Sequence, residues 1–180
     1  MRIVSGKFRA KKLSPPTHNI RPTLDKVKQA LYTKLQFQIE GSCVLDLFSG
    51  SGALGIEAVS RGAKKVVFVD VNQKSVDLTK KNLSSLKLDG TTEIKVHKSD
   101  YLTYLETTKE VFDIIILDPP YEKGFYLPAL EVIFQRKLLK PEGIIICEHL
   151  REQELKQNIF EVMDIKHYGS VSLTYLISKQ

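Results

Sequence analysis

Apolar positions along this chain fall into two alternating patterns, one typical of buried strands and one typical of amphipathic helices. Short apolar runs of about four to eight residues predict strands, and segments with an apolar helical stripe lie between them. Strands are expected at 43–47, 65–70, 93–97, 111–117, 143–147, 160–168 and 171–178, and helices at 53–61, 73–86, 125–136 and near 151–157, with a short amphipathic segment near 101–106. Such alternation predicts an α/β fold with a doubly wound, mostly parallel, seven-stranded sheet. The closing pair around Tyr168-Gly169-Ser170 predicts a hairpin, so one terminal strand should run antiparallel.

The first forty residues carry a different pattern. Residues 2–13 mix apolar and basic side chains around Gly6, which predicts a short hairpin with one basic face. After Pro15-Pro16, a helix is expected to open with Thr23 as its N-cap. Its apolar stripe is Val27, Ala30, Leu31 and Leu35, and three lysines should lie off that stripe, Lys26, Lys28 and Lys34. We therefore divide the chain into a small basic N-terminal extension, residues 1–40, and a main domain, residues 41–180.

Positive charge is concentrated in that extension. Residues 1–40 contain 9 Lys and Arg against 2 acidic residues, a net charge of +7, whereas residues 41–180 contain 18 against 19, a net charge of −1. Because lysines and arginines that neutralise phosphates release counterions, a basic extension predicts a polyanionic substrate. The alternative is a solvated basic arm without a ligand. The candidate phosphate contacts are Arg2, Lys7, Arg9, Lys11 and Lys12.

Composition argues against several classes of protein. The 180 residues, 42% of them hydrophobic and 27% charged, are typical of a soluble globular domain. No stretch approaches the roughly 18 apolar residues of a membrane span, and the amino terminus lacks a signal-peptide core. We therefore expect a cytoplasmic monomer without membrane contact. Cys43 and Cys147 lie alone in apolar segments and the histidines lack ligand spacing, so no metal site is expected.

A strand followed by a glycine turn and a helix marks the candidate ligand loop. The segment reads Cys43-Val-Leu-Asp-Leu-Phe-Ser-Gly50-Ser-Gly52-Ala-Leu-Gly55. A backbone that turns sharply beside a ligand has no room for a Cβ, so Gly50 and Gly52 are the expected contact positions. The next strand ends at Asp70, a carboxylate placed to accept hydrogen bonds from a ribose. Phe48 and Val71 flank these positions and complete this side of the predicted cofactor site.

Two cofactors are compatible with this loop. Gly50-x-Gly52-x-x-Gly55 also matches the fingerprint of nicotinamide dinucleotides, which favours a dehydrogenase. Asp46 argues against a dehydrogenase, because a carboxylate just before this turn would repel a pyrophosphate. The same carboxylate suits S-adenosylmethionine, whose sulfonium and amino groups are cationic. The D/E-x-x-x-G-x-G arrangement resembles the cofactor loop of methyltransferases.

The apolar run 111–117 ends in the candidate catalytic corner, Asp118-Pro119-Pro120-Tyr121. Neither proline has an N–H, so the backbone offers carbonyl acceptors beside the Asp118 carboxylate, a combination suited to an exocyclic amine. Tyr121 adds a flat ring on which a nucleobase could stack. The tetrapeptide resembles the D/N-P-P-Y/F motif of amino-group methyltransferases, although Pro-Pro after an acid is also an ordinary way to end a strand.

Four acids are expected at or just beyond the carboxyl ends of strands, namely Asp46, Asp70, Asp100 and Asp118. Ligands of doubly wound sheets bind there, where the strand order reverses, and four carboxylates around one crevice favour a cationic ligand. Asp100 and the next residue, Tyr101, both belong to the predicted cofactor site. Asp100 has two interpretations. It accepts a hydrogen bond from an adenine amino group, or it caps the next helix.

With these motifs placed, the chain resembles nearly end to end the RsmD family of bacterial ribosomal RNA methyltransferases. The distinctive matches are Arg2-Ile-Val-Ser-Gly-Lys-Phe-Arg9, Arg21-Pro-Thr-Leu-Asp-Lys-Val-Lys28 and Gly55-Ile-Glu-Ala-Val-Ser-Arg-Gly-Ala63. The resemblance implies a Rossmann-like class I methyltransferase fold and S-adenosylmethionine as cofactor. It implies methylation of the 2-amino group of a guanine in 16S ribosomal RNA, free or in a small-subunit assembly particle. It also adds Arg21 and Thr23 to the RNA contacts.

Three other functions would use similar residues. A DNA adenine or cytosine amino-methyltransferase would share the Asp-Pro-Pro-Tyr corner, but 180 residues leave no room for a separate target-recognition domain. A protein glutamine methyltransferase typically has Asn in place of Asp118 and needs no basic extension. A catalytically silent RNA-binding relative is the non-enzymatic alternative, and the intact acids Asp46, Asp70 and Asp118 argue against it.

Overall fold

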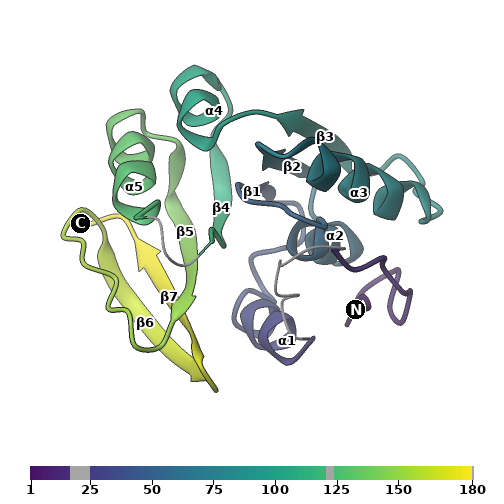
Figure 1. Ribbon diagram of the computed structural model, residues 1–180, viewed down its shortest axis with the longest axis horizontal. Coiled ribbons are helices and arrows are strands. Elements are labelled where there is room, and N and C mark those ends of the chain that lie inside the picture. Colours follow the sequence, from purple (N-terminus) through teal and green to yellow (C-terminus); the bar gives the residue numbers. More distant parts are fainter. Residues whose placement is uncertain (17–24, 121–123, 180) are drawn as a thin grey trace.

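A computed structural model describes residues 1–16, 25–120 and 124–179 of the chain (Figure 1). Within these residues one sheet has the strand order β3-β2-β1-β4-β5-β7-β6. The strands are β1 (Cys43–Asp46), β2 (Lys65–Asp70), β3 (Glu93–Lys98), β4 (Phe112–Leu117), β5 (Leu139–Leu150), β6 (Glu161–Tyr168) and β7 (Val171–Ile177). The helices are α1 (Asp25–Lys34), α2 (Ala53–Ser60), α3 (Gln73–Ser84), α4 (Tyr101–Thr107) and α5 (Tyr126–Gln135). The predicted α/β fold is confirmed.

Strand directions follow the predicted doubly wound pattern. β1 pairs in parallel with β2 and β4, β2 with β3, and β4 with β5. β7 is antiparallel to both of its neighbours, β5 and β6, which confirms the expected closing hairpin. The strand order reverses beside β1, and the carboxyl ends of β1, β2 and β4 meet at one edge of the sheet. Ligands of such sheets bind at this edge.

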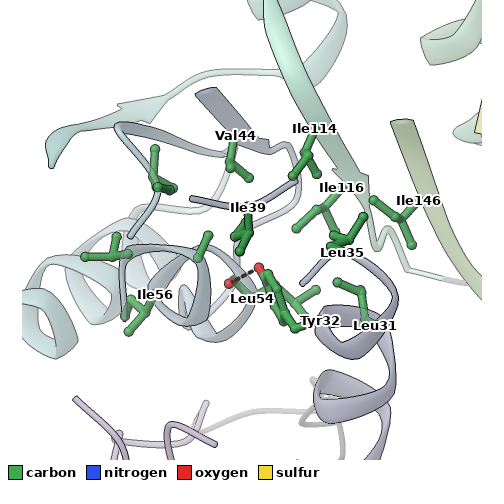
Figure 2. Packing of buried hydrophobic residues seen from close by; sticks show 14 of the residues in the cluster. Leu31, Tyr32, Leu35, Ile39, Val44, Leu54, Ile56, Ile114, Ile116 and Ile146 are labelled. Atoms are coloured by element: carbon green, nitrogen blue, oxygen red, sulfur yellow. Dashed lines mark hydrogen bonds between the residues drawn. The ribbon is translucent and has the colours of Figure 1, made fainter. Parts of the chain in front are cut away.

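Side chains alternate between the two faces of the sheet, as the two-residue period of a strand requires. On one face Val44, Ile114 and Ile146 pack with Leu31 and other residues of α1, α2 and α3 (Figure 2). Residues of the opposite parity, such as Leu45, pack on the other face with α4 and α5. Figure 1 shows the two groups of helices on opposite sides of the sheet. Both faces are therefore covered, and this is why the central strands read as continuous apolar runs.

The helix expected near 151–157 is absent, so that prediction is wrong. The chain turns instead: the Gln153 N–H donates to the Leu150 carbonyl at 3.0 Å. The Gln157 side chain then accepts from the N–H groups of Ile159 and Phe160, both at 2.9 Å. Only Leu155 of this segment is apolar, so a helix here would have no apolar stripe to bury.

Residues 1–16, which we call the N-terminal arm, fold back on themselves as predicted, but through one isolated antiparallel bridge between Arg2 and Lys12. The Ile3 N–H donates to the Lys11 carbonyl at 2.9 Å, and the Leu13 N–H to the Met1 carbonyl at 3.1 Å. Ile3 and Leu13 are buried in the hydrophobic cluster that also contains α1, α2 and the sheet. The arm and α1 therefore share a core with the sheet, and the division of the chain at residue 40 stays a prediction.

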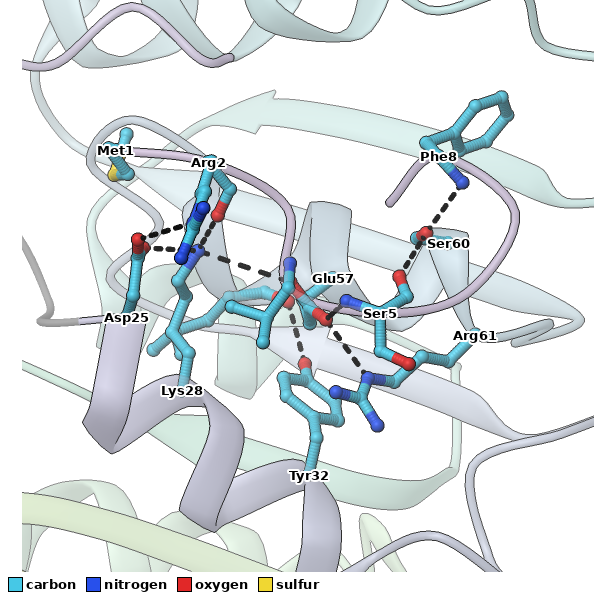
Figure 3. Close-up of polar contacts among 12 residues, drawn as sticks. Met1, Arg2, Ser5, Phe8, Asp25, Lys28, Tyr32, Glu57, Ser60 and Arg61 are labelled. Atoms are coloured by element: carbon cyan, nitrogen blue, oxygen red, sulfur yellow. Dashed lines mark hydrogen bonds and ion pairs between the residues drawn. The ribbon is translucent and has the colours of Figure 1, made fainter. Parts of the chain in front are cut away.

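Lys28 lies inside the protein, whereas the apolar stripe of α1 had predicted a position off the buried face (Figure 3). It comes three residues before Leu31, which places it on the buried face of the helix. The ammonium group donates to the Arg2 carbonyl and lies 3.5 Å from Asp25 and 3.9 Å from Glu57. Burial lowers the pKa of Lys28, and the two carboxylates oppose that shift.

Glu57 of α2 holds the arm in place (Figure 3). Its fully buried carboxylate accepts the N–H groups of Val4 at 2.8 Å and Ser5 at 2.9 Å, and pairs with Arg61 at 3.0 Å. The Ser60 hydroxyl accepts the Phe8 N–H at 2.9 Å and donates to the Ser5 carbonyl at 2.6 Å. These bonds attach the arm to α2, the helix that begins at the glycine loop.

Among the residues that the structure describes, no helix has the length and apolar character needed to cross a membrane.

Replacing Glu57 with Ala should lower the free energy of unfolding by roughly 3–5 kcal/mol, because it leaves Lys28 with less compensation and the two arm N–H groups without an acceptor. Urea unfolding followed by circular dichroism measures this change. Glu106→Ala, on the exposed face of α4, is the matched control and should stay within about 0.5 kcal/mol of the wild type. Equal unfolding midpoints for Glu57→Ala and the wild type would show that the carboxylate does not hold the arm.

Candidate functional site

The glycine loop connects β1 to α2 in the predicted way. Gly50 has φ +53° and Gly52 has φ +77°, a region that other residues rarely adopt. A Cβ on Gly52 would also lie 2.9 Å from the Thr79 side chain of α3. The third glycine of the pattern, Gly55, meets Phe68 of β2, where an added Cβ would lie 2.3 Å from the ring. The first two glycines therefore shape the turn, and Gly55 lets α2 pack closely on the sheet.

Asp46 lies beneath this turn with 1% of its surface exposed. Its carboxylate accepts the Gly55 N–H at 2.8 Å, in the first turn of α2. Burial raises the pKa of Asp46 to about 7, against the lowering effect of the Gly55 hydrogen bond, and the nearby Asp70 charge raises it further. In this structure Asp46 therefore holds the glycine loop on α2. Its predicted contact with the cofactor stays a prediction.

Asp70 ends β2 and faces the same loop. One carboxylate oxygen accepts the Gly50 N–H at 2.9 Å and the other accepts the Asn72 N–H at 2.8 Å. The side chain is half-buried, so these bonds leave lone pairs toward solvent. Val71, the next residue, is 65% exposed and forms an apolar surface beside that carboxylate.

Asp100 caps α4, which is one of the two roles considered for it. One carboxylate oxygen accepts the N–H groups of Leu102 at 2.9 Å and Thr103 at 3.2 Å. The next residue, Tyr101, belongs to a group of three rings. Its ring centroid lies 5.2 Å from that of Phe48, in the glycine loop, and 5.3 Å from that of Phe125, which precedes α5. Both aromatic residues predicted for the cofactor site therefore lie together.

The Asp118-Pro119-Pro120 corner follows β4 directly, one strand from the glycine loop. The Leu47 N–H donates to the Ile116 carbonyl at 3.1 Å, so the two loops leave the sheet side by side. Asp118 is half-buried, Pro119 is buried and Pro120 is exposed. Three predicted site residues lie outside the described residues, namely Arg21, Thr23 and Tyr121.

The basic side chains of the arm are all exposed, as a phosphate-binding role requires. Arg2 pairs with Asp25 at 3.3 Å, and Lys7 pairs with Asp89. Within the described parts of the chain no acidic partner lies within ion-pair distance of the other three, Arg9, Lys11 and Lys12. These three are therefore the arm's available cations.

Two residues of α3 that hold the loop were missed in the sequence. The Thr79 hydroxyl donates to the Gly50 carbonyl at 3.1 Å, and the Asn82 amide donates to the Ser51 carbonyl at 2.9 Å. Both side chains are buried. Their spacing could have revealed them, because positions 75, 79 and 82 put polar residues on the same helix face as the apolar Val76 and Leu83. Polar residues on a buried helix face need partners, and here the partners are the loop carbonyls.

A cavity of about 490 Å³ opens beyond the carboxyl end of β5. It is lined by the start of α5, by His149 and by residues 152–156, the segment that turns instead of forming a helix. Tyr126 and His149 contribute two rings, whose centroids lie 6.4 Å apart at 80°. In the described residues, His, Cys, Asp and Glu side chains form no cluster of three or more that could hold a metal.

Comparison with known proteins agrees with this geometry. The model of the family described as "Conserved hypothetical protein 95" matches residues 1–177. The "Ribosomal RNA small subunit methyltransferase D" of Haemophilus influenzae is 35% identical over 158 residues, which cover 86% of this chain and 81% of that protein. The structure of yhhF from Escherichia coli is 29% identical, with a TM-score of 0.85, over 100% of this chain and 99% of its own.

A more distant likeness concerns the fold alone. The 16S rRNA N2 methyltransferase RsmC of Thermus thermophilus, solved with AdoMet and guanosine, is 22% identical with a TM-score of 0.68. The alignment covers 91% of this chain and 44% of that protein. The predicted class I methyltransferase fold is therefore confirmed.

The raised pKa of Asp46 predicts a pH-dependent stability. Its folded pKa is about 7 and its unfolded pKa is about 3.9, so the folded state holds this proton more tightly. The stability that the proton contributes is fully present below pH ~4 and is lost as the pH rises through 7. Relative to Asp46→Asn, the wild type should therefore lose up to about 1.4 kcal/mol of unfolding free energy per pH unit across that range.

Chemical unfolding at pH 4 to 8 measures this difference. Asp77→Asn, which removes a carboxylate from the exposed face of α3, should follow the wild-type profile. A constant difference between the wild type and Asp46→Asn across this range would contradict the prediction.

Proposed function

This chain belongs to the RsmD family, the family described as "Conserved hypothetical protein 95", whose model matches residues 1–177. We propose that it methylates the 2-amino group of a guanine in small-subunit ribosomal RNA, with S-adenosylmethionine as the methyl donor. One observation carries the proposal. The Asp118-Pro119-Pro120 corner and the glycine loop leave adjacent strands at the point where the strand order reverses. An acceptor for an amine thus lies beside a loop shaped for a nucleoside-containing cofactor.

The residues around the glycine loop fit S-adenosylmethionine in chemical character. Asp70 has lone pairs left to accept ribose hydroxyls, since each carboxylate oxygen makes one backbone hydrogen bond. The exposed Val71 and the rings of Phe48 and Tyr101 offer apolar surfaces for adenine. Asp100 is occupied by its capping bonds, but its second oxygen can still accept from the adenine amino group. Asp46 acts from beneath, through the loop that it holds.

Asp118 and the Pro119 carbonyl would hold the exocyclic amine. When bound, the cofactor supplies a methyl carbon made electrophilic by its sulfonium. The lone pair of the guanine amine is delocalised into the ring, so hydrogen bonds from its N–H groups to these two acceptors turn the lone pair toward the methyl carbon. They also stabilise the positive charge that develops on nitrogen. Asp118 need not remove a proton before attack, because the C–N bond would form as the bond between methyl carbon and sulfur breaks, and the proton would then leave the positively charged nitrogen to solvent.

The target base must leave its stack to reach this corner. We propose that Tyr121 stacks on the extruded base and that Arg21 and Thr23 contact the RNA, roles that concern residues outside the described parts of the chain. The cavity of about 490 Å³ beside Tyr126 and His149 offers space for the rest of the nucleotide. The exposed cations of the arm would bind the neighbouring phosphates.

The related methyltransferase functions differ from this one in their substrate. DNA and protein glutamine methyltransferases would use the same corner, and the name of the H. influenzae relative favours ribosomal RNA over both. The arm favours a polyanion over a protein substrate. Whether free RNA or an assembly particle is methylated, and the cytoplasmic monomer expected from the sequence, stay predictions.

Asp118→Ala should lower the rate of methyl transfer by about 10²–10³-fold while S-adenosylmethionine still binds, because charge stabilisation at the amine is removed. Asp118→Asn keeps a neutral acceptor and should reduce the rate only about tenfold. The assay incubates each protein with labelled S-adenosylmethionine and total RNA, DNA or protein from cells that lack the enzyme, and then maps the label. Unchanged turnover in Asp118→Ala would remove this residue from the mechanism, and label in DNA or protein would replace the proposed substrate.

Replacing Arg9, Lys11 and Lys12 with Gln should weaken RNA binding and flatten its salt dependence. The slope of log K against log salt should fall by about 0.7–0.9 for each phosphate that the arm no longer neutralises. This change is cleaner than truncating the arm, because Ile3 and Leu13 belong to the core. The matched control replaces three exposed lysines elsewhere, Lys64, Lys109 and Lys137. Equal slopes for the arm variant and the wild type would show that the arm does not bind phosphates.

A further inference from the structure

Asn82 joins two segments that are far apart in the sequence. Its side chain, 1% exposed, lies on α3 between the arm and the glycine loop. The amide oxygen accepts the Ser14 N–H at 2.8 Å, and the amide nitrogen donates to the Ser14 carbonyl at 3.2 Å and to the Ser51 carbonyl at 2.9 Å. Both amide hydrogens are therefore used, one on the arm and one on the loop.

The two partners of Asn82, Ser14 and Ser51, lie in the two segments that are proposed to bind ligands. Ser51 lies between Gly50 and Gly52, at the turn proposed to face the cofactor. Ser14 lies two residues after Lys12, in the arm proposed to bind phosphates. Ser51 also touches the arm through its hydroxyl, which lies 3.8 Å from the Met1 sulfur. Ser14 of the arm and Ser51 of the loop thus share one hydrogen-bond partner, Asn82. A ligand that moves either segment therefore changes the position of the side chain that also holds the other segment.

Because Asn82 is buried, its three hydrogen bonds depend closely on where Ser14 and Ser51 lie. The Asn82 amide is shielded from solvent, so a carbonyl or N–H that moves away from it leaves an unsatisfied buried group. One side chain also has few rotamers, and a rotation that follows the Ser51 carbonyl withdraws the amide from Ser14. Loss of one bond therefore disfavours the other two, and we distinguish an ordered state with all three bonds from a loosened state in which some of them are lost.

We propose that Asn82 is a positioning residue that couples cofactor binding at the glycine loop to RNA binding at the arm. The inference rests on the function proposed above. A ligand that orders one segment favours the ordered state, so the second ligand has less ordering to supply. By thermodynamic linkage the coupling is reciprocal: each ligand raises the affinity of the other by the same factor. That factor should fall in the range of about 5–150-fold that is typical of such coupling.

The test measures this coupling factor directly. The probes are S-adenosylhomocysteine, which binds without turnover, and an in vitro transcript of small-subunit ribosomal RNA. The Kd of the transcript is measured with and without saturating S-adenosylhomocysteine, and the Kd of S-adenosylhomocysteine with and without the transcript. The wild type should give the same factor, at least fivefold, in both directions, and Asn82→Ala should give a factor near one.

Two control variants separate coupling from simple loosening. Ser60→Ala weakens the attachment of the arm to α2 without touching the loop, so RNA affinity should fall equally with and without S-adenosylhomocysteine. Thr79→Val removes a hydrogen bond to the loop without touching the arm, so the affinity for S-adenosylhomocysteine should fall equally with and without RNA. Both controls should keep the wild-type coupling factor. A merely structural role of Asn82 would change affinities but not their ratio.

A second variant covers the case in which Asn82→Ala does not fold. Ser14→Pro removes the arm N–H that donates to the Asn82 amide oxygen, whereas the bond from Asn82 to the Ser51 carbonyl can still form, and this variant should also reduce the factor. A factor of one in the wild type with both ligands bound, or a wild-type factor in Ser14→Pro or a folded Asn82→Ala, would overturn the proposal. Those results would not contradict the proposed methyl transfer. Failure of the wild type to bind either ligand would overturn the proposed function as well.

Discussion

The buried carboxylate of Glu57 is the interaction on which the arrangement of the site depends. It accepts the N–H groups of Val4 and Ser5, which are partly buried and have no neighbouring strand to pair with in the described part of the chain. It also offsets the charge of Lys28, which α1 carries into the same space. Because Glu57 belongs to the helix that starts at the glycine loop, the arm is attached to the element that positions the cofactor site.

Other carboxylates along the edge of the sheet also accept backbone N–H groups. Asp46 accepts from α2, Asp70 from the glycine loop and Asp100 from α4, so each acid satisfies N–H groups that a turn into a helix leaves without partners. These carboxylates are structural before any ligand arrives. Asp70 and Asp100 remain suited to a cationic cofactor, because they place negative charge at this edge of an otherwise basic protein. One set of residues can thus shape the loops and select the ligand.

Several parts of the site could be predicted because they depend on local sequence. Gly50 and Gly52 require positive φ, and the apolar runs around them define β1 and β4. The contacts that the sequence did not reveal join distant segments. Lys28 was predicted at the surface because its partner, Glu57, is far along the chain. The error at 151–157 has a local cause: Leu155 is the only apolar residue of the segment, so a helix there would have no apolar stripe to bury. Asn82 gave no motif, because its two partners are single backbone groups.

The sequence by itself determined the α/β architecture, the strand-end acids, the Asp118-Pro119-Pro120 corner and the basic character of the first forty residues. These follow from periodicity, turn chemistry and charge, which act over a few residues at a time. Only the tertiary structure decided that the arm is part of the core, that Asp46 is buried deeply enough to have a pKa of about 7, and that Asn82 spans arm and loop. Burial and shared hydrogen bonds are properties of packing, and packing joins residues that the order of the chain keeps apart.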